Sequence, residues 1–324
     1  MEISTQFVKM ISGFFGMFLL LTPITVLAQT KTRVVVIPLG DEAKPLKNII
    51  TVAKANGNFT DPRAAVNSIT DASATNPYLV VIGPGVYTIT HTVQMKPYVD
   101  ITGSGENVTK LTGAISTPNS ASSAVVAGAN FSALSSLTVE NTGGSTISIA
   151  LYNDSASPVL SNVTAMASGG TAWSYGIRND SSSPTMTNVT ATASGLSYNY
   201  GVYNRSSSPK MTDVIATASG GQGTYGVLND ISSSPIMTNV TATGSGGTII
   251  DVGVYTENSS SAVIRRSTIE GDDYALYTPS GTTVVSQSTL RGDVSGGTRN
   301  KCVACDNGSE TAFGTLDSSC QPIP

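Results

Sequence analysis

Short apolar runs alternate with Thr, Ser, Asn and Gly through the middle of the chain, and one phrase occurs there four times. The copies read SASPVLSNVTAMASGG at 155–170, SSSPTMTNVTATASGL at 181–196, SSSPKMTDVIATASGG at 206–221 and SSSPIMTNVTATGSGG at 232–247. Their prolines, Pro158, Pro184, Pro209 and Pro235, lie 26, 25 and 26 residues apart. A fixed period of this length indicates one small unit stacked on copies of itself, so that neighbours share a continuous core.

Aligning the copies places apolar residues in three columns. The first is Leu134, Leu160, Met186, Met211, Met237, Ile264 and Val285; the second is Val139, Ala165, Ala191, Ala216, Ala242, Ile269 and Leu290; the third is Leu151, Ile177, Val202, Val227, Val254 and Leu276. Short alternations broken by Gly and Asn are typical of strands and turns. The pattern predicts an all-β, right-handed parallel β-helix with three-strand coils about 25 residues long, each strand stacked about 4.8 Å from its equivalent.

Two polar columns accompany the apolar ones. One contains Asn162, Asn188, Asp213 and Asn239, and the other contains Asn153, Asn179, Asn204 and Asn229. Asn tolerates the left-handed backbone of turns, and its amide can bond to the copies above and below. We interpret both columns as turn ladders; the alternative is a polar stripe that binds a ligand.

The first 28 residues are typical of a secretion signal. Ile11–Leu21 is an apolar run of suitable length, and Val26-Leu27-Ala28 is a small-residue cleavage site. A membrane anchor is the alternative, but the run is short and Pro23 follows it. We therefore expect cleavage after Ala28, no remaining transmembrane segment, and a secreted or cell-surface protein. The rest divides into an N-terminal cap and first coils (29–130), repeat coils (131–297) and a C-terminal cap (298–324).

The charge of the chain is low and slightly negative. Only 12% of its 324 residues are charged and the net charge is −4, against about 25% charged residues in ordinary soluble domains. No basic run occurs, which argues against nucleic acid as a partner.

The three cysteines, Cys302, Cys305 and Cys320, lie near the end of the chain. A zinc site needs four ligands, and the single His, His91, is far away in sequence. A redox Cys-x-x-Cys belongs at the start of a helix in a βαβ unit, which is missing from this pattern. Export permits disulfides, so we expect Cys302–Cys320 to pin the C-terminal cap and leave Cys305 unpaired.

The N-terminal coils resemble a known family. The segments ITVAKANGNFTDPRAAVNSI (50–69) and NPYLVVIGPGVYTITHTVQMKPYVDITGSGENVTKLTG (76–113) are similar to the opening of pectin methylesterases. That resemblance implies the pectin-lyase-like β-helix superfamily and covers about 64 residues. The residues agree with it: Asp61 can cap a helix near 62–72 whose apolar residues close the open end of the coils.

The catalytic signatures of that family do not follow. Ile89 stands where its Gly-x-Tyr-x-Glu element has Glu, and its Gln-Asp-Thr-Leu and Leu-Gly-Arg-Pro-Trp segments are missing. The remaining candidates are late in the chain, where Asp272 and Asp273 could act in catalysis. In the aligned register Glu270 lies over Arg291, as an exposed ion pair, and Asp272 lies over Asp293, where Ca²⁺ could bind. We favour a solvated polar rim over a calcium site, and expect no cofactor.

One residue after each third-column position stands a further column, which is largely aromatic. It contains Tyr152, Arg178, Tyr203, Leu228, Tyr255 and Tyr277. Because neighbouring strand residues point to opposite faces, this column lies outside if the third column is inside. An exposed aromatic row with Arg178 predicts a platform for a polysaccharide; the alternative is aromatic packing that only protects the sheet.

Three functions remain open on this evidence. We favour an exported, non-catalytic β-helix repeat protein that contacts a polysaccharide or a cell-surface glycan, because identical coils make a uniform surface and an active site needs some coils to differ. The first alternative is an enzyme, a pectin-type carbohydrate esterase or polysaccharide lyase with atypical site residues. The second alternative is a structural spacer, in which the repeats only set the length.

Overall fold

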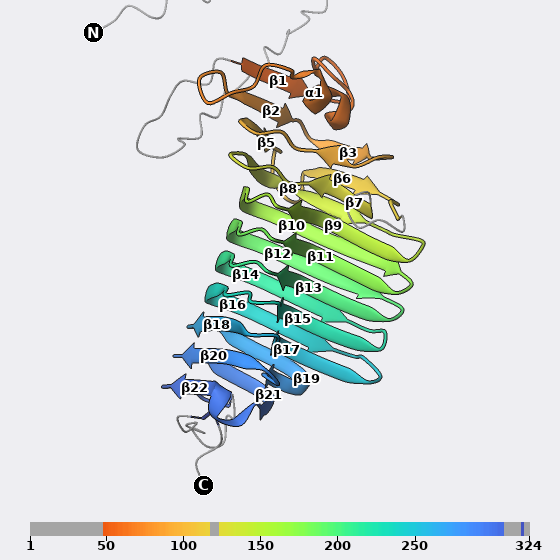
Figure 1. Ribbon diagram of the computed structural model, residues 1–324. Coiled ribbons are helices and arrows are strands. Elements are labelled where there is room, and N and C mark those ends of the chain that lie inside the picture. The colour runs from red at the N-terminus through yellow and green to blue at the C-terminus, as the bar shows by residue number, and fades with distance from the viewer. Residues whose placement is uncertain (1–47, 117–122, 308–318, 321–324) are drawn as a thin grey trace, which may run out of the picture. The chain divides into compact units, whose positions relative to one another are not determined.

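A computed structural model describes residues 48–116, 123–307 and 319–320. The signal peptide predicted for residues 1–28 lies outside these residues. The described chain winds into about nine coils of a parallel β-solenoid with one short helix near its N-terminal end (Figure 1). Its strands form a single sheet that runs around the coils. The predicted β-helix is confirmed.

The first coils are built from short strands, three to a coil, until the first two join into one long strand at residues 133–141. They are β1 (Asn48–Val52), β2 (Tyr78–Ile82), β3 (Gly85–Thr88), β4 (Val93–Gln94), β5 (Val99–Thr102), β6 (Thr109–Gly113), β7 (Ala124–Ala127), β8 (Ala133–Asn141) and β9 (Ile147–Asp154). Strands β2, β3 and β4 pair in parallel with β5, β6 and β7 of the next coil.

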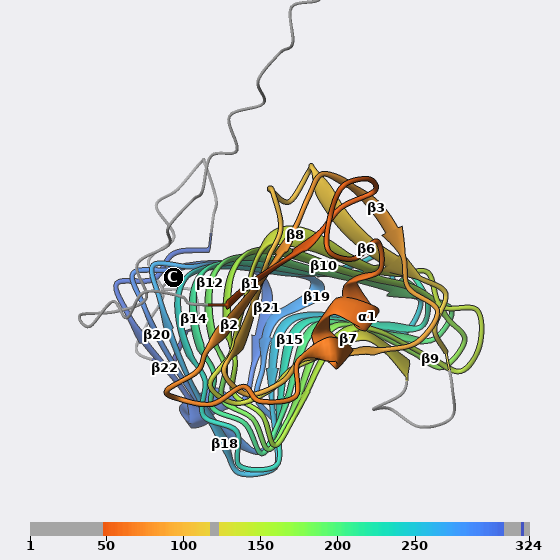
Figure 2. The ribbon, with the colours of Figure 1, turned by 90° about the horizontal axis from the view of Figure 1, so that it is seen from above.

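The helix α1 (Pro62–Ser68) closes the N-terminal end. Asp61 caps it, its carboxylate accepting from the Arg63 N–H at 2.8 Å. Ala65 and Val66 are buried in the core, and α1 lies over the space that the coils enclose (Figure 2). The helix is shorter than the predicted 62–72, because the backbone turns extended at Ile69.

The repeats form the central coils, in which the first two predicted strands run together. These strands are β10 (Val159–Gly170), β11 (Trp173–Asp180), β12 (Thr185–Gly195), β13 (Tyr198–Arg205), β14 (Lys210–Ser219), β15 (Gly223–Asp230), β16 (Ile236–Ser245) and β17 (Ile250–Thr256). Each long strand bends at one left-handed residue: Asn162, Asn188, Asp213 and Asn239, with φ between 51° and 54°. These residues form an exposed ladder in which the Asn188 amide donates to Asn162 at 2.8 Å.

The last coils contain β18 (Ser260–Arg265), β19 (Thr268–Tyr277), β20 (Gly281–Ser286), β21 (Thr289–Ser295), the 3₁₀ turn η2 (Gly297–Arg299) and β22 (Asn300–Val303). The predicted disulfide between Cys302 and Cys320 is present, with Cα atoms 5.1 Å apart. Cys305 is a free, buried thiol. The disulfide therefore attaches residue 320 to the final coil.

The three apolar columns are in register and buried. Leu160 pairs with Met186, Ala165 with Ala191 and Ile177 with Val202 in consecutive coils, and these columns fill one continuous core. The second Asn column also lies inside: Asn153, Asn179, Asn204 and Asn229 are fully buried. The first three amides donate to the next coil's amide oxygen at 2.8–2.9 Å, and Asn229 donates to the Thr256 hydroxyl at 3.4 Å. Both Asn columns are ladders, as predicted, but the second lies within strands and not in a left-handed turn.

The serines of the repeated phrase explain why it recurs. Ser182, Ser207 and Ser233 are buried at the corner between coils. Each backbone N–H donates to the hydroxyl of the next coil's serine at 3.0–3.1 Å, the last of these being Ser260. The hydroxyl of each also donates to a carbonyl two or three residues earlier, at 2.7–2.8 Å. A corner buried without these bonds would leave backbone N–H groups unpaired.

Candidate functional site

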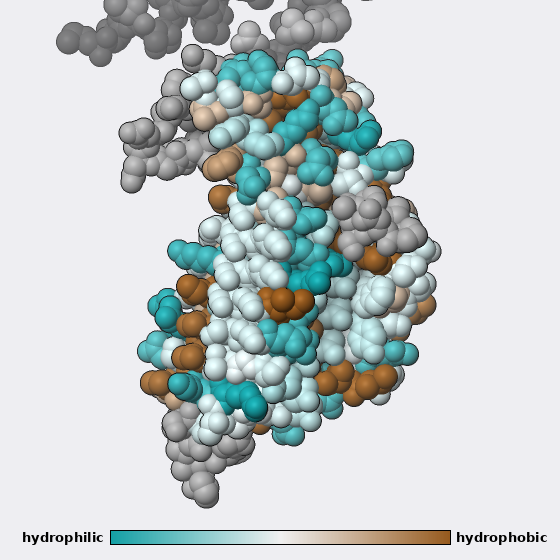
Figure 3. Space-filling view, in the orientation of Figure 1, coloured by the Kyte–Doolittle hydropathy of each residue, from teal (hydrophilic) through white to brown (hydrophobic). Residues whose placement is uncertain are grey.

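Aromatic side chains gather on one outer surface of the coils, the outward side of β9, β11, β13, β15, β17 and β19, which we call the aromatic face. Nine of the 12 tyrosines and the single Trp lie there. They are Tyr152, Tyr175, Tyr198, Tyr200, Tyr203, Tyr225, Tyr255, Tyr274, Tyr277 and Trp173. In the orientation of Figure 3 the surface over β11, β13 and β15 is pale to teal, with hydrophobic colour only in small areas.

A stack of tyrosines forms the middle of this face. The rings of Tyr175, Tyr200 and Tyr225 are parallel within 10°, with centroids 4.9 and 5.2 Å apart. Burial raises the pKa of both Tyr175 and Tyr225 to about 12. These phenols therefore stay neutral at physiological pH, and their ring faces are occupied by one another.

A column of small residues, Gly or Ala, lies beside this stack where the alternation of the strands is broken. Tyr175 lies in the outer cluster and Ile177 in the core, although residues two apart on a regular strand share a face. Gly176 between them has no partner in the ladder, and neither does Gly201 in the next coil. A Cβ on Gly176 would lie 2.7 Å from the Gly201 carbonyl. Ala150 and Ala275 occupy the same column in the first and last of these coils, also without a ladder partner and buried in the core. The break in the ladder at this column reverses the alternation, and only small residues fit there.

The predicted platform column is on this face but is less exposed than we expected. Tyr152 is 5% exposed and Leu228 is buried, and Tyr203, Tyr255 and Tyr277 are half-buried. Tyr203 packs edge-on against Tyr175 and Tyr200, at 5.6 and 5.4 Å between centroids. The expectation of a freely exposed row is thus wrong, because a second aromatic row packs beside it. Whether the column binds a ligand stays a prediction.

Arg178 is held tightly within the aromatic face. Its Nη2 donates to the Asp180 carboxylate at 2.8 Å and its side chain is 14% exposed. The guanidinium lies 5.1–5.6 Å from the ring centroids of Tyr152, Tyr175 and Tyr203. Cations over aromatic rings are attracted to the ring faces, so Arg178 links the Asp180 carboxylate to the tyrosine stack.

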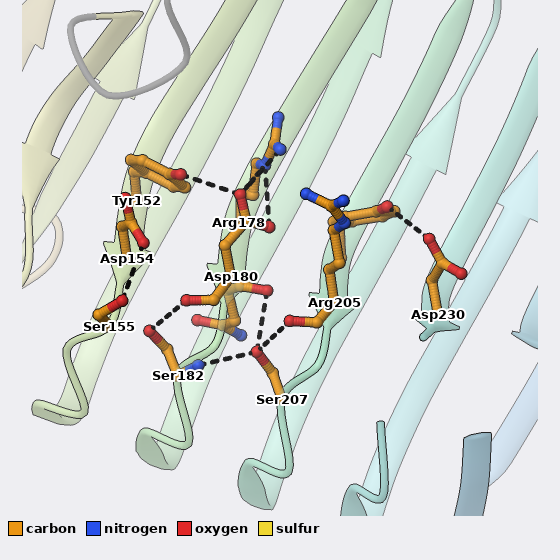
Figure 4. Close-up of polar contacts among 11 residues, drawn as sticks. Tyr152, Asp154, Ser155, Arg178, Asp180, Ser182, Arg205, Ser207 and Asp230 are labelled. Atoms are coloured by element: carbon orange, nitrogen blue, oxygen red, sulfur yellow. Dashed lines mark hydrogen bonds and ion pairs between the residues drawn. The ribbon is translucent and has the colours of Figure 1, made fainter. Parts of the chain in front are cut away.

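A row of charges borders the face two residues beyond the tyrosine column, and we call it the charged edge. It contains Asp154, Asp180, Arg205, Asp230 and Glu257; the first four are register partners in successive coils (Figure 4). Tyrosine hydroxyls donate to it: Tyr152 to Asp180 at 2.9 Å, Tyr203 to Asp230 at 3.0 Å and Tyr255 to Glu257 at 3.1 Å.

Burial determines the protonation state of the tyrosines and of Glu257 along the charged edge. It raises the pKa of Tyr152, Tyr203 and Tyr255, and each neighbouring carboxylate raises it further. The phenols are therefore neutral donors. Burial also raises the pKa of Glu257 above its ordinary 4.5, and the nearby Asp230 charge adds to this shift.

The most accessible rings lie along the far side of the face. Trp173 is 40% exposed and Tyr198, its register partner in the next coil, is half-buried. A Cβ on Gly223 would lie 2.9 Å from Cδ1 of Tyr198, so the glycine leaves room for that ring. Trp173, the most exposed of these rings, is therefore best placed to meet a ligand, and Tyr198 lies beside it in the next coil.

The late charged cluster differs from the prediction in one respect. Glu270 pairs with Arg291 at 3.6 Å as an exposed ion pair, as expected. Asp293 lies opposite Tyr274 and not Asp272, because the register shifts after Glu270. Asp272 and Asp273 instead accept backbone N–H groups of Gly246 and Asp251 at 2.9 and 2.8 Å. Among the described residues no group of three or more His, Cys, Asp or Glu side chains could hold a metal ion.

A second outer surface of the same coils provides a reference. After the bend, two outward rows of β10, β12, β14 and β16 are uncharged: Thr164, Thr190, Ile215 and Thr241 form one row, and Met166, Thr192, Thr217 and Thr243 form the next. We call this surface the threonine face. Met166 and Ile215 are 37% and 47% exposed.

Sequence reasoning missed the charged edge, Trp173 and the tyrosine stack. The pattern held a usable signal, because Tyr152-x-Asp154, Arg178-x-Asp180 and Tyr203-x-Arg205 place both members of each pair on one side of a strand.

The comparisons with known proteins agree with this architecture. No protein-family model and no curated protein matches the chain. The solved pectin methylesterase of Aspergillus niger, in deglycosylated form, is 14% identical over 85% of this chain and 94% of its own, with a TM-score of 0.53. That of Yersinia enterocolitica is 12% identical over 76% and 94%, also with a TM-score of 0.53.

The chain has the pectin-lyase-like β-helix fold of pectin methylesterases. At these identities the likeness shows the fold alone, so the function has to be argued from this chain's own surface.

Proposed function

We propose that this is an exported, non-catalytic β-helix protein that binds a polysaccharide along its aromatic face. The observation that carries the proposal is the gathering of nine tyrosines and the single Trp on one outer surface. Large aromatic side chains combine an apolar ring with a polar group, which suits ligands that have apolar and hydroxylated sides. Sugars are ligands of this kind.

The repeat supports a long ligand over a small one. Trp173 and Tyr198 lie in neighbouring coils, and tyrosines continue to Tyr277 in the later coils. Coils are about 4.8 Å apart, so successive units of an extended chain meet successive rings. The charged edge runs beside the rings and supplies hydrogen-bonding groups in each coil from Asp154 to Glu257.

An enzymatic function, such as hydrolysis of an ester on the polysaccharide, is less well supported than binding. Ester hydrolysis needs a nucleophile, an acid–base partner and donors for the oxyanion. Asp180 is engaged by Arg178 and Tyr152, and Asp230 by Tyr203 and Asn258. The enzymatic alternative, a carbohydrate esterase or lyase, is favoured by one observation: Arg178 and Asp180 share a strand, and Asp154 lies beside Asp180 in the adjacent coil. Methanol or acetate release that disappears in Asp180→Asn would establish it.

Export is supported by two features. The first 28 residues have the pattern of a signal peptide, and the disulfide Cys302–Cys320 is suited to an oxidising compartment. No helix in the described part of the chain is long and apolar enough to cross a membrane. Fractionation of the source cells, with nonreducing peptide mapping of the disulfide, would test the location.

The binding proposal is tested by affinity electrophoresis through gels that contain single polysaccharides. We expect at least one polymer to retard the mature protein, and Trp173→Ala to remove most of that retardation. Thr192→Ala on the threonine face is the matched control and should leave it unchanged. Retardation that persists in Trp173→Ala and in Tyr198→Ala would show that the aromatic face is not the site.

A further inference from the structure

The charged edge narrows the class of ligand, in an inference that rests on the proposed function. We propose that the bound polysaccharide is neutral, without acidic groups, and that its hydroxyls donate hydrogen bonds to the carboxylates of the charged edge. Pectate and other polymers with a carboxylate on each unit are then poor ligands, although the fold is that of pectin methylesterases.

The charge balance along the edge is negative. Four carboxylates, those of Asp154, Asp180, Asp230 and Glu257, accompany two guanidinium groups, Arg178 and Arg205. The edge therefore has two negative charges in excess. Complementary charge guides association and like charge opposes it, most strongly at low salt. An acidic polymer lying over the rings would meet this repulsion in the coils of Asp154, Asp230 and Glu257.

The arginines do not reverse this balance. Arg178 is nearly covered and bonds Asp180 through both Nε and Nη2, at 3.1 and 2.8 Å to Oδ2. The positive charge of Arg178 is thus neutralised by the Asp180 carboxylate of its own coil. Arg205 is exposed and stands in register between Asp180 and Asp230. A ligand carboxylate that approached Arg205 would therefore lie between two protein carboxylates.

The carboxylates keep capacity to accept further hydrogen bonds. An ionised carboxylate offers about four acceptor positions. Asp230 receives Tyr203 at 3.0 Å on Oδ2 and Asn258 at 2.7 Å on Oδ1, and Glu257 receives Tyr255 at 3.1 Å. The tyrosines hold these groups in place beside the rings. Hydroxyl donors to a carboxylate make charge-assisted bonds, which are stronger than neutral ones.

Gel retardation with a matched panel tests this inference: polygalacturonate, its fully methyl-esterified form, a neutral galactan and a neutral glucan. We expect a neutral polymer to bind best and polygalacturonate to bind about tenfold or more weakly at low salt. The double variant Asp230→Asn/Glu257→Gln should narrow that difference severalfold, by weakening the neutral ligand and admitting polygalacturonate. Asp213→Asn, an exposed carboxylate in a different corner ladder, should change neither.

The outcomes separate the two proposals. Tightest binding to polygalacturonate, lost in Trp173→Ala, would overturn the neutral-ligand inference and leave the binding function standing. Failure of every polymer in the panel to bind would overturn both. A double variant that binds all polymers as the unaltered protein does would show that the charged edge does not select the ligand.

Discussion

The threonine face and the aromatic face belong to the same coils and share one core, yet their surfaces are built differently. On the threonine face small uncharged side chains repeat from coil to coil over Ala165, Ala191 and Ala216. On the aromatic face the rings form a second packed layer outside the sheet, tied to Arg178 and the charged edge. The comparison teaches that the repeat determines the interior, while each outer surface is free to take on its own role.

The largest expected effect comes from a charge placed inside rather than outside the sheet. Val227 is fully buried, so Val227→Asp would leave an unpaired carboxylate in a dry core and should prevent folding. The matched control is Ile215→Asp on the threonine face, where Ile215 is 47% exposed; we expect a change within about 0.5 kcal/mol. Urea unfolding followed by circular dichroism measures both, and a folded Val227→Asp protein would contradict the assignment of the third column.

The next largest difference in unfolding free energy is expected between the two Asn ladders. Asn179→Ala removes hydrogen bonds to Asn153 and Asn204 in the core and should cost about 2–4 kcal/mol, since each buried group left unpaired costs about 1–3 kcal/mol. Asn188→Gly removes an exposed bond to Asn162 while keeping the left-handed backbone accessible, and should cost about 1 kcal/mol or less. Equal losses of unfolding free energy would mean that the interior ladder contributes no more than the corner.

Tyrosine truncation separates the two outer surfaces. Tyr203→Ala loses ring contacts with Tyr175 and Tyr200 and the bond to Asp230, and we expect a cost of about 2–3 kcal/mol. If Tyr203 were freely exposed, its truncation would instead weaken ligand binding and leave the free energy of unfolding unchanged. Thr217→Ala on the threonine face should cost about 0.5 kcal/mol or less. Thermal unfolding of both variants decides whether the aromatic layer is packed structure.

The smallest effect concerns pH, with opposite signs at two carboxylates. Glu257 has a raised pKa, so the stability it contributes is present below 4.5 and is lost as pH rises through its folded pKa. Glu140, next to the threonine face, has its pKa lowered by the Thr112 hydroxyl and then by Lys110. Its contribution is present above 4.5 and is lost as pH falls through its folded pKa.

As pH rises from 4 to 7, the free energy of unfolding of Glu257→Gln should therefore increase relative to that of the unaltered protein. That of Glu140→Gln should decrease, and each change should be less than about 1 kcal/mol. Unfolding free energies at both pH values test this. The same sign for both variants would refute the assigned environments.

The sequence was sufficient for the fold, because each interior column repeats at a constant period and needs no knowledge of distant contacts. It predicted Leu160 over Met186, the Asn153–Asn179 ladder and the disulfide Cys302–Cys320. It failed where one residue changes the local geometry. The break in the ladder at Gly176 leaves Tyr175 on the outer side, and the register shift after Glu270 separates Asp272 from Asp293.

The candidate site was predicted only in part for the same reason. Tyr152 and Tyr203 are on the outer side as alternation requires, but their exposure depends on Tyr175 and Tyr200, which simple alternation places inside. Asp180 and Asp230 bind Tyr152 and Tyr203 of the preceding coil, and Asp230 also binds Asn258 of the following one. Such contacts follow from side-chain packing and not from a period.

Hydroxyl-radical footprinting tests the central claim most directly, because each face carries its own reactive side chains. Trp173 and Tyr198 report on the aromatic face, and Met166, 37% exposed, reports on the threonine face. With a saturating neutral polysaccharide we expect oxidation of Trp173 and Tyr198 to fall severalfold while Met166 reacts as in the free protein. Protection of Met166 with Trp173 and Tyr198 unchanged would contradict the account.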